Sequence, residues 1–123
     1  MSYLAGIVGK KRTQKVSKQE KRIDETLQLS GRRRGALLKE EVWFEGDRVV
    51  KYSLAYINPR ICAVDNGRVL GYDNTHQYHH RHFRGNVEAI EFHGYEALVT
   101  RFERELYQLW KVEDEQKDEN PNQ

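Results

Sequence analysis

The chain has 123 residues, a net charge of +2 and one cysteine, which together fit a small single domain without an internal disulfide. Its apolar runs are shorter than the roughly 18 residues of a membrane-spanning helix, and the basic residues near the N-terminus follow the apolar stretch instead of preceding it, unlike a signal peptide. We therefore expect a cytoplasmic protein with no membrane partner.

Charge is distributed unevenly along the chain. Residues 1–34 carry ten Lys and Arg against three Asp and Glu, whereas residues 112–123 carry one against five. A basic leading segment is typical of a surface that binds a polyanion, and an acidic segment poor in apolar residues is typical of disorder. We divide the chain into a basic N-terminal segment with a short helix (1–34), a core domain (35–111) and an acidic disordered tail (112–123).

The first predicted elements are one helix and one hairpin. Residues 16–29 are rich in helix formers, with apolar side chains at helical spacing, so we expect a short, largely exposed helix there. Residues 36–45 and 48–56 follow, rich in strand-forming apolar and aromatic side chains, and the Gly46-Asp47 pair separates them. This pattern predicts an antiparallel hairpin.

A second hairpin, a further strand and a helix are predicted next. Asn66-Gly67 lies between the apolar runs 61–64 and 68–70, and this dipeptide favours the type I′ turn of a hairpin. Residues 86–92 fit a fifth strand, and apolar side chains recur every 3.6 residues through 95–111. We expect an α+β fold, an antiparallel sheet of about five strands with an N-terminal helix and a C-terminal helix packed on it.

The main lead to function is the segment His76-Gln77-Tyr78-His79-His80-Arg81-His82, which holds four of the five histidines. It lies in a predicted loop, where functional residues concentrate. Histidine suits proton transfer, phosphate recognition or metal binding. His80 and His82 would share one face of an extended segment, with His76 or Asp73 as a third metal ligand. Because no helical pair of histidines and no second cysteine accompany them, we expect no metal or other cofactor.

Acid and base catalysis on RNA needs no metal. Cleavage through the 2′-hydroxyl requires a base, an acid and a cation for the phosphate. His80 and His82 are the candidate acid and base, Arg84 is the candidate phosphate clamp, and Tyr72 and Asp73 complete the candidate catalytic set. The structural alternative is that the imidazoles pack over a sheet edge and Asp73 forms a turn.

A second group of residues is predicted to bind nucleic acid. Three adjacent arginines flanked by glycines are placed at a sheet end, where guanidinium groups reach phosphates. The set is Arg32, Arg33, Arg34, Lys10, Lys11, Arg12 and Arg81. Alternation along an extended segment points Arg81 away from the paired histidines, so Arg84 or the 32–34 run is the better clamp at the cleaved phosphate. The same basic residues would equally suit an acidic protein partner.

One succession of motifs runs from the second predicted hairpin to the C-terminal helix: Tyr72-Asp73-Asn74, His76, His79-His80-Arg81-His82-Phe83, Val87-Glu88, Phe102 and Glu105. It resembles the TumE-like toxin family of bacterial toxin–antitoxin systems over roughly residues 35–110. The resemblance implies a small cytoplasmic toxin paired with a helix-turn-helix antitoxin. It also suggests similarity to ribonuclease toxins of the RelE kind, which attack messenger RNA.

Our leading interpretation is a toxin directed at RNA, associated with ribosomes or free of them, and acting as a metal-independent endoribonuclease through the His-rich loop. The alternative is a non-catalytic module that binds nucleic acid or a protein through the basic N-terminal segment. A third hypothesis is a hydrolase with a histidine-bound metal. The oligomeric state is left open.

Overall fold

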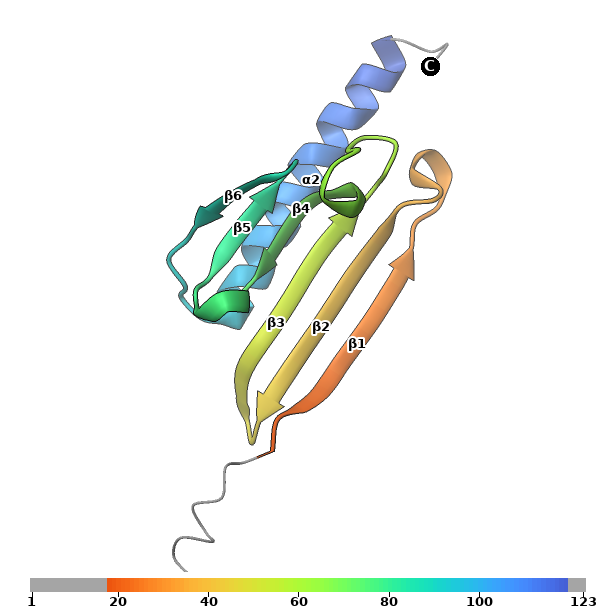
Figure 1. The fold of residues 1–123 in the computed structure, drawn as a ribbon. Helices are drawn as coiled ribbons and strands as arrows, with labels where there is room; N and C mark the ends of the chain where they lie inside the picture. Colours follow the sequence, from red (N-terminus) through yellow and green to blue (C-terminus); the bar gives the residue numbers. More distant parts are fainter. Residues whose placement is uncertain (1–17, 120–123) are drawn as a thin grey trace, which may run out of the picture.

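The computed structural model describes residues 18–119, which form one six-stranded antiparallel sheet and one long helix beside it (Figure 1). The strands lie in the sheet in chain order, as a meander. The elements are β1 (Glu20–Gln28), β2 (Leu37–Glu45), β3 (Arg48–Ile57), β4 (Arg68–Asp73), β5 (His80–Phe83), β6 (Asn86–Ala89) and α2 (Tyr95–Glu119), with three short 3₁₀ turns, η1 (Gly31–Arg33), η2 (Asp65–Gly67) and η3 (Thr75–Gln77).

The predicted N-terminal helix is wrong, because residues 20–28 form the edge strand β1. This strand pairs antiparallel with β2, with Leu27 opposite Leu38. Ile23 and Leu27 are four residues apart, which places them on one side of a helix and equally on one side of a strand. Pairing with β2 satisfies a row of backbone N–H and C=O groups, whereas a short exposed helix with two apolar residues has little to bury. The sheet therefore takes this segment.

The predicted β2–β3 hairpin is present, but the second predicted hairpin is not. Gly46 turns the first one with a positive φ of 61°. Asn66 also has a positive φ, 55°, but it lies within η2, and residues 61–64 belong to a loop, so that β4 pairs directly with β3. Pro59 at the start of this loop lacks an N–H and stops the ladder.

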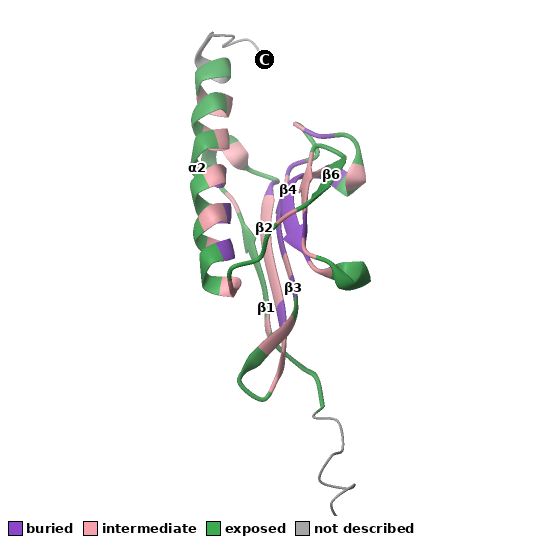
Figure 2. Cartoon of the chain, turned by 90° about the vertical axis from the view of Figure 1, so that its left-hand side faces the viewer, coloured by how far each residue is buried: buried purple, intermediate pink, exposed green. Residues whose placement is uncertain are grey.

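The helix α2 packs on β3 and β4 through one apolar face. Leu98, Phe102 and Leu106 are four residues apart and buried, and they meet a sheet surface that includes the fully buried Tyr56 and Tyr72. Figure 2 shows the buried positions in the central strands and on the side of α2 that faces them. The predicted C-terminal helix on the sheet is therefore present, as the only helix of the described range.

The far end of α2 is tied to η1. The Arg33 guanidinium donates to the Trp110 carbonyl at 2.9 Å and lies 3.4 Å from a Glu113 carboxylate oxygen. The Tyr56 hydroxyl donates to the same carboxylate at 3.0 Å. Burial raises the pKa of Glu113 above its ordinary value, although these hydrogen-bond and charge partners oppose the shift. These contacts hold the helix at Trp110 and Glu113. α2 ends at Glu119, so its last turns lie in the range 112–123 that was predicted as a tail.

Replacing Phe102 with alanine is expected to destabilise the domain, because a buried aromatic ring on α2 is lost and a cavity is left. The expected loss is about 3–5 kcal/mol in the free energy of unfolding, measured by urea denaturation. Tyr107→Ala on the same helix is the control, since Tyr107 is 68% exposed. Equal losses for the two variants would contradict the packing of α2 described above.

Candidate functional site

The paired histidines and Asp73 meet on the sheet face that points away from α2. In the ladder between β4 and β5, Asp73 lies opposite His80, and Gly71 lies opposite His82. Side chains alternate between the two faces of a strand. His80, His82 and Asp73 therefore project together from the open face, which is nearer the viewer in Figure 1.

A single carboxylate holds both imidazoles. Asp73 Oδ1 lies 2.8 Å from His80 Nε2, and Asp73 Oδ2 lies 3.0 Å from His82 Nε2. The two imidazole rings meet edge to face, with their centroids 4.8 Å apart. The three side chains form a compact His–Asp–His cluster, the name used from here on.

Asp73 is held in its charged form. Burial alone raises the pKa of its carboxyl group, but hydrogen bonds from Thr75 and the nearby His80 and His82 outweigh burial and keep the pKa below its ordinary value. The Thr75 backbone N–H donates to Oδ1 at 3.0 Å. An ionised Asp73 carboxylate can accept a hydrogen bond from one N–H group of each imidazole.

His82 is fixed as a neutral ring with its proton on Nε2. Its Nδ1 lies 3.0 Å from an Arg68 guanidinium nitrogen, and because arginine only donates, Nδ1 accepts. Its Nε2 therefore donates to Asp73. Burial and the Arg68 charge lower the pKa of His82, although Asp73 and Asp65 oppose the shift.

His80 faces hydrogen-bond acceptors on both sides. Its Nδ1 lies 3.0 Å from the Tyr78 carbonyl oxygen and its Nε2 lies against Asp73. Both contacts are hydrogen bonds only when the ring carries two protons. His80 is 4% exposed, and the half-exposed Tyr78 ring stacks on it with centroids 4.4 Å apart. The cluster thus pairs an imidazole that contacts only acceptors with one that contacts both an acceptor and the Arg68 guanidinium.

A backbone irregularity brings Arg68 to this face. The register between β3 and β4 shifts between Tyr56 and Ile57, and such bulges redirect side chains near functional sites. The Arg68 chain then crosses Gly71, where an added Cβ would lie only 2.6 Å from Arg68 Cδ. Asp65 anchors the guanidinium through two contacts of 2.8 and 3.1 Å.

The cluster has the residue types of a metal site, with ligand atoms of Asp73, His80 and His82 all within 4.8 Å of one another. A neutral imidazole binds a metal through Nε2 only when its proton is on Nδ1. At His82 that nitrogen accepts from Arg68, whose guanidinium also lies 3.5 Å from Asp73 Oδ2. With its proton on Nε2, His82 as placed cannot ligate a metal through that nitrogen, so the donor set in this hydrogen-bonded arrangement does not fit a metal.

Two of the predicted site residues lie on the other face of the sheet. The Tyr72 hydroxyl donates to Glu105 of α2, and the Arg81 guanidinium lies 2.9 Å from the same carboxylate. Burial raises the pKa of the Tyr72 hydroxyl far above its ordinary value. Arg81 also lies 3.5 Å from Glu88. Tyr72 and Arg81 therefore face α2, away from the His–Asp–His cluster.

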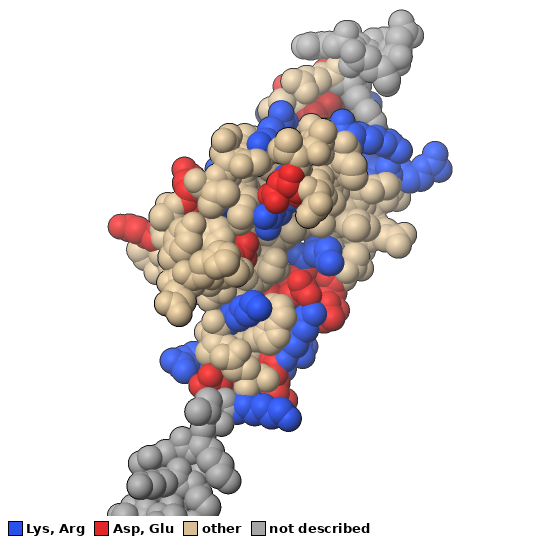
Figure 3. Space-filling view, in the orientation of Figure 1, with Lys and Arg blue, Asp and Glu red and all other residues tan. Residues whose placement is uncertain are grey.

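The structure brings two arginines of the predicted nucleic-acid-binding set, Arg32 and Arg33, together with Arg84, the predicted phosphate clamp, at one end of the sheet. Arg32, Arg33 and Arg84 line a cavity of about 470 Å³ with Arg60, which the sequence did not single out. Arg34 ends η1 and is exposed. Figure 3 shows blue side chains gathered at its upper right, over the η1 end of the molecule. The other predicted basic residues, Lys10, Lys11 and Arg12, lie outside the described residues.

Arg68 and Asp65 were not predicted as site residues. Their spacing of three across the Asn66-Gly67 turn is typical of an ion pair at a strand start, a signal that the turn prediction does not use. The position of Gly71 opposite His82 shows why Arg68 reaches the cluster. The strand pairing that creates this contact is non-local, so only the structure reveals it.

The comparisons identify the family of this single-helix α+β domain. A family model described as toxin TumE matches residues 6–110, and the chain belongs to the TumE toxin family. Membership assigns it to the toxins of toxin–antitoxin systems and implies an antitoxin partner. The resemblance drawn from the motifs is therefore confirmed.

No curated protein and no solved structure gives a significant match. No helix of residues 18–119 is long and apolar enough to cross a membrane.

Replacing Arg68 with methionine is expected to raise the pKa of His82. The change removes the cation that opposes protonation and leaves Asp73 and Asp65, which favour it. NMR titration of the imidazole protons measures the shift, and His82→Ala assigns the signal. Arg48→Met is the control, because Arg48 is exposed and pairs with Glu45. An unchanged or lower pKa at His82 would contradict the contact.

Proposed function

We propose that this toxin cleaves RNA without a metal, through the His–Asp–His cluster of Asp73, His80 and His82. The observation that carries the proposal is that the oxygens of one buried carboxylate lie 2.8 and 3.0 Å from the Nε2 atoms of two imidazoles, of which only His82 also contacts an arginine. Cleavage through a 2′-hydroxyl needs a group that accepts a proton and a group that donates one. Two imidazoles supply both when one is neutral and the other is protonated.

His82 is the proposed base. Asp73 orients its ring through Nε2, and the lone pair on Nδ1 points toward the Arg68 guanidinium. When a phosphate of RNA attracts that guanidinium, Nδ1 is free to take the proton of the 2′-hydroxyl. Asp73 and Asp65, the latter 3.8 Å from Nδ1, then stabilise the imidazolium that forms.

His80 is the proposed acid for the leaving 5′-oxygen. Its low exposure means that the exposed Tyr78 ring stacked on it must shift to admit that oxygen. Tyrosine rings are also platforms for unstacked RNA bases. A base that stacks on Tyr78 would therefore move the ring and bring the scissile phosphate to the two histidines.

The proposed path for the RNA backbone leads from Arg68 to the cavity that Arg60 and Arg84 line. Residues 58–67 separate the two sites, with Asp65 on the side of the His–Asp–His cluster and Arg60 on the side of the cavity. Arg60 and Arg84 are the preferred phosphate contacts there, because Arg33 is already engaged by Glu113 and Asp114. The proposal omits Arg81, whose guanidinium is paired on the other face.

The proposal also covers the partner and the compartment. An RNA-cleaving toxin that acts on messenger RNA works in the cytoplasm, with or without the ribosome. A helix-turn-helix antitoxin is the partner type that the motif resemblance suggests.

His82→Ala is expected to reduce cleavage of a single-stranded RNA oligonucleotide by roughly 10²–10⁴-fold, because the base is lost. His93→Ala is the control, since His93 is exposed and lies away from the cluster. EDTA is expected to leave the wild-type rate unchanged, because no step uses a metal. A folded His82→Ala protein with the wild-type rate would rule out His82 as the base, and a rate abolished by EDTA and restored by Mn²⁺ or Zn²⁺ would assign the chemistry to a metal.

A further inference from the structure

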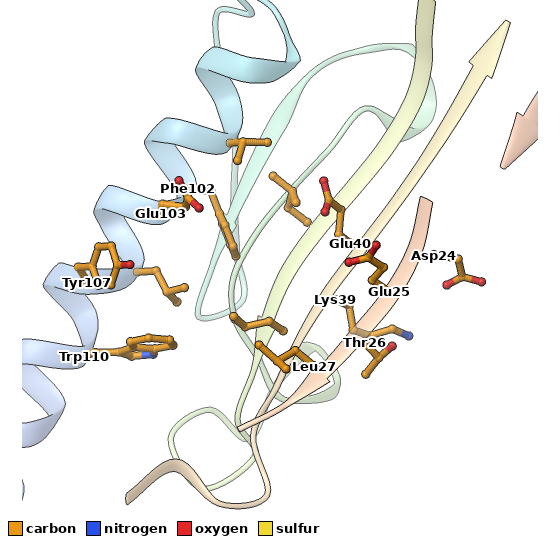
Figure 4. Close-up of a pocket in the computed structure, with 14 residues that line it drawn as sticks. Asp24, Glu25, Thr26, Leu27, Lys39, Glu40, Phe102, Glu103, Tyr107 and Trp110 are labelled. Carbon is orange, nitrogen blue, oxygen red and sulfur yellow. The ribbon is translucent and has the colours of Figure 1, made fainter. Parts of the chain in front are cut away.

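The face of the sheet beside α2 is covered over only part of its width. α2 packs on β3 and β4, and beyond it a groove of about 670 Å³ runs between the helix and strands β1 and β2. Figure 4 shows Phe102 and Trp110 projecting from α2 toward the strands, on which Glu25, Leu27 and Glu40 stand. The described residues leave this groove open.

The floor of the groove is apolar and partly exposed. Leu38 and Leu54 line it from the strands, with Leu106 on α2. Leu27 is 58% exposed and Tyr107 is 68% exposed. Exposed apolar surface that forms a continuous lining marks interaction sites in soluble proteins.

The border of the groove is acidic. Three carboxylates of the lining, Glu25, Glu40 and Glu103, belong to the side of the sheet that faces α2, whereas Asp24 pairs with Lys21 at 3.1 Å. Glu25 and Glu40 are directly opposite each other in the β1–β2 ladder, an arrangement of like charges that destabilises a sheet. Within residues 18–119 neither carboxylate forms an ion pair. Glu40 accepts a hydrogen bond from the Tyr95 hydroxyl at 2.6 Å, and Lys21 is engaged by Glu41. A cation supplied by a partner relieves this repulsion.

The uncovered width matches one helix. Strands lie about 4.8 Å apart, so the midline of β1–β2 is about 9.6 Å from the midline of β3–β4, where α2 packs. Packed helices lie about 8–10 Å apart. A second helix laid beside α2 would therefore cover β1 and β2 and complete the helical layer on this face of the sheet.

We propose that this groove is the docking site for the antitoxin, which enters it with one amphipathic helix. The apolar side of that helix packs on Leu27, Leu38 and Leu106, and its Lys or Arg side chains face Glu25, Glu40 and Glu103. The proposal rests on membership of a toxin family, which implies an antitoxin, and is independent of the proposed RNA cleavage. The groove and the His–Asp–His cluster lie on opposite faces of the sheet, so the antitoxin and the chemistry use separate surfaces.

The test is the affinity of purified toxin for the antitoxin encoded beside it, measured by calorimetry. The double variant Glu25→Lys, Glu103→Lys is expected to weaken binding about tenfold or more, because like charges then meet across the interface. Both residues are exposed, so folding should persist, as circular dichroism will check. Asp47→Lys, Glu91→Lys is the matched control, with the same change of net charge at exposed positions outside the groove lining, and is expected to bind within about twofold of wild type.

Two further variants test the apolar floor of the groove and the independence of binding from RNA cleavage. Leu27→Asp is expected to weaken binding through the apolar floor, and His82→Ala is expected to leave the affinity unchanged whether or not RNA is cleaved. Wild-type affinity in the folded Glu25→Lys, Glu103→Lys variant overturns the proposal. So does a toxin dimer in sedimentation that the same variant dissociates without any change in antitoxin affinity, because the groove then binds a second copy.

Discussion

The arrangement of the open sheet face depends on the carboxylate of Asp73, which accepts a hydrogen bond from each of two imidazoles. A buried carboxylate is stable only when donors surround it, and here they come from His80, His82 and Thr75. The β4–β5 register places Asp73 opposite His80. A shift of β5 by one residue against β4 would turn both histidines toward α2. The cluster therefore forms only in the observed register, and its hydrogen bonds in turn favour that register.

Arg68 gives the two imidazoles different roles. It donates to His82 and is anchored by Asp65, while His80 faces only acceptors. Three features position it: the ion pair across a tight turn, the shifted register between β3 and β4, and the missing Cβ of Gly71. None of them involves a histidine, although together they determine which histidine contacts Arg68.

The two faces of the sheet divide the proposed tasks of a toxin. The open face carries the ionisable cluster, whereas the other face carries α2, the Tyr72–Glu105–Arg81 contacts and the acidic groove over β1 and β2. An antitoxin helix on the groove would add a second helix to the layer that α2 begins.

The sequence predicted the local features and missed the non-local ones. The 3.6-residue periodicity of apolar side chains predicted the C-terminal helix. The two-residue alternation of a strand predicted that His80 and His82 share one face and that Arg81 points to the other face. The helix predicted over residues 16–29 is wrong because the spacing of Ile23 and Leu27 fits both periods, and only the open edge of β2 decides between them. The roles of Tyr72 and Arg81 depend on Glu105, 24 or more residues away, which periodicity does not bring into contact.

The chemistry of the RNA ends tests the central claim most directly. Attack by a 2′-hydroxyl that His82 has deprotonated leaves a 2′,3′-cyclic phosphate on one fragment and a 5′-hydroxyl on the other. Mass spectrometry of the fragments from a defined oligonucleotide, cleaved in the presence of EDTA, is expected to show these ends. Fragments with a 3′-hydroxyl and a 5′-phosphate, or an oligonucleotide left intact by folded toxin, would contradict the account.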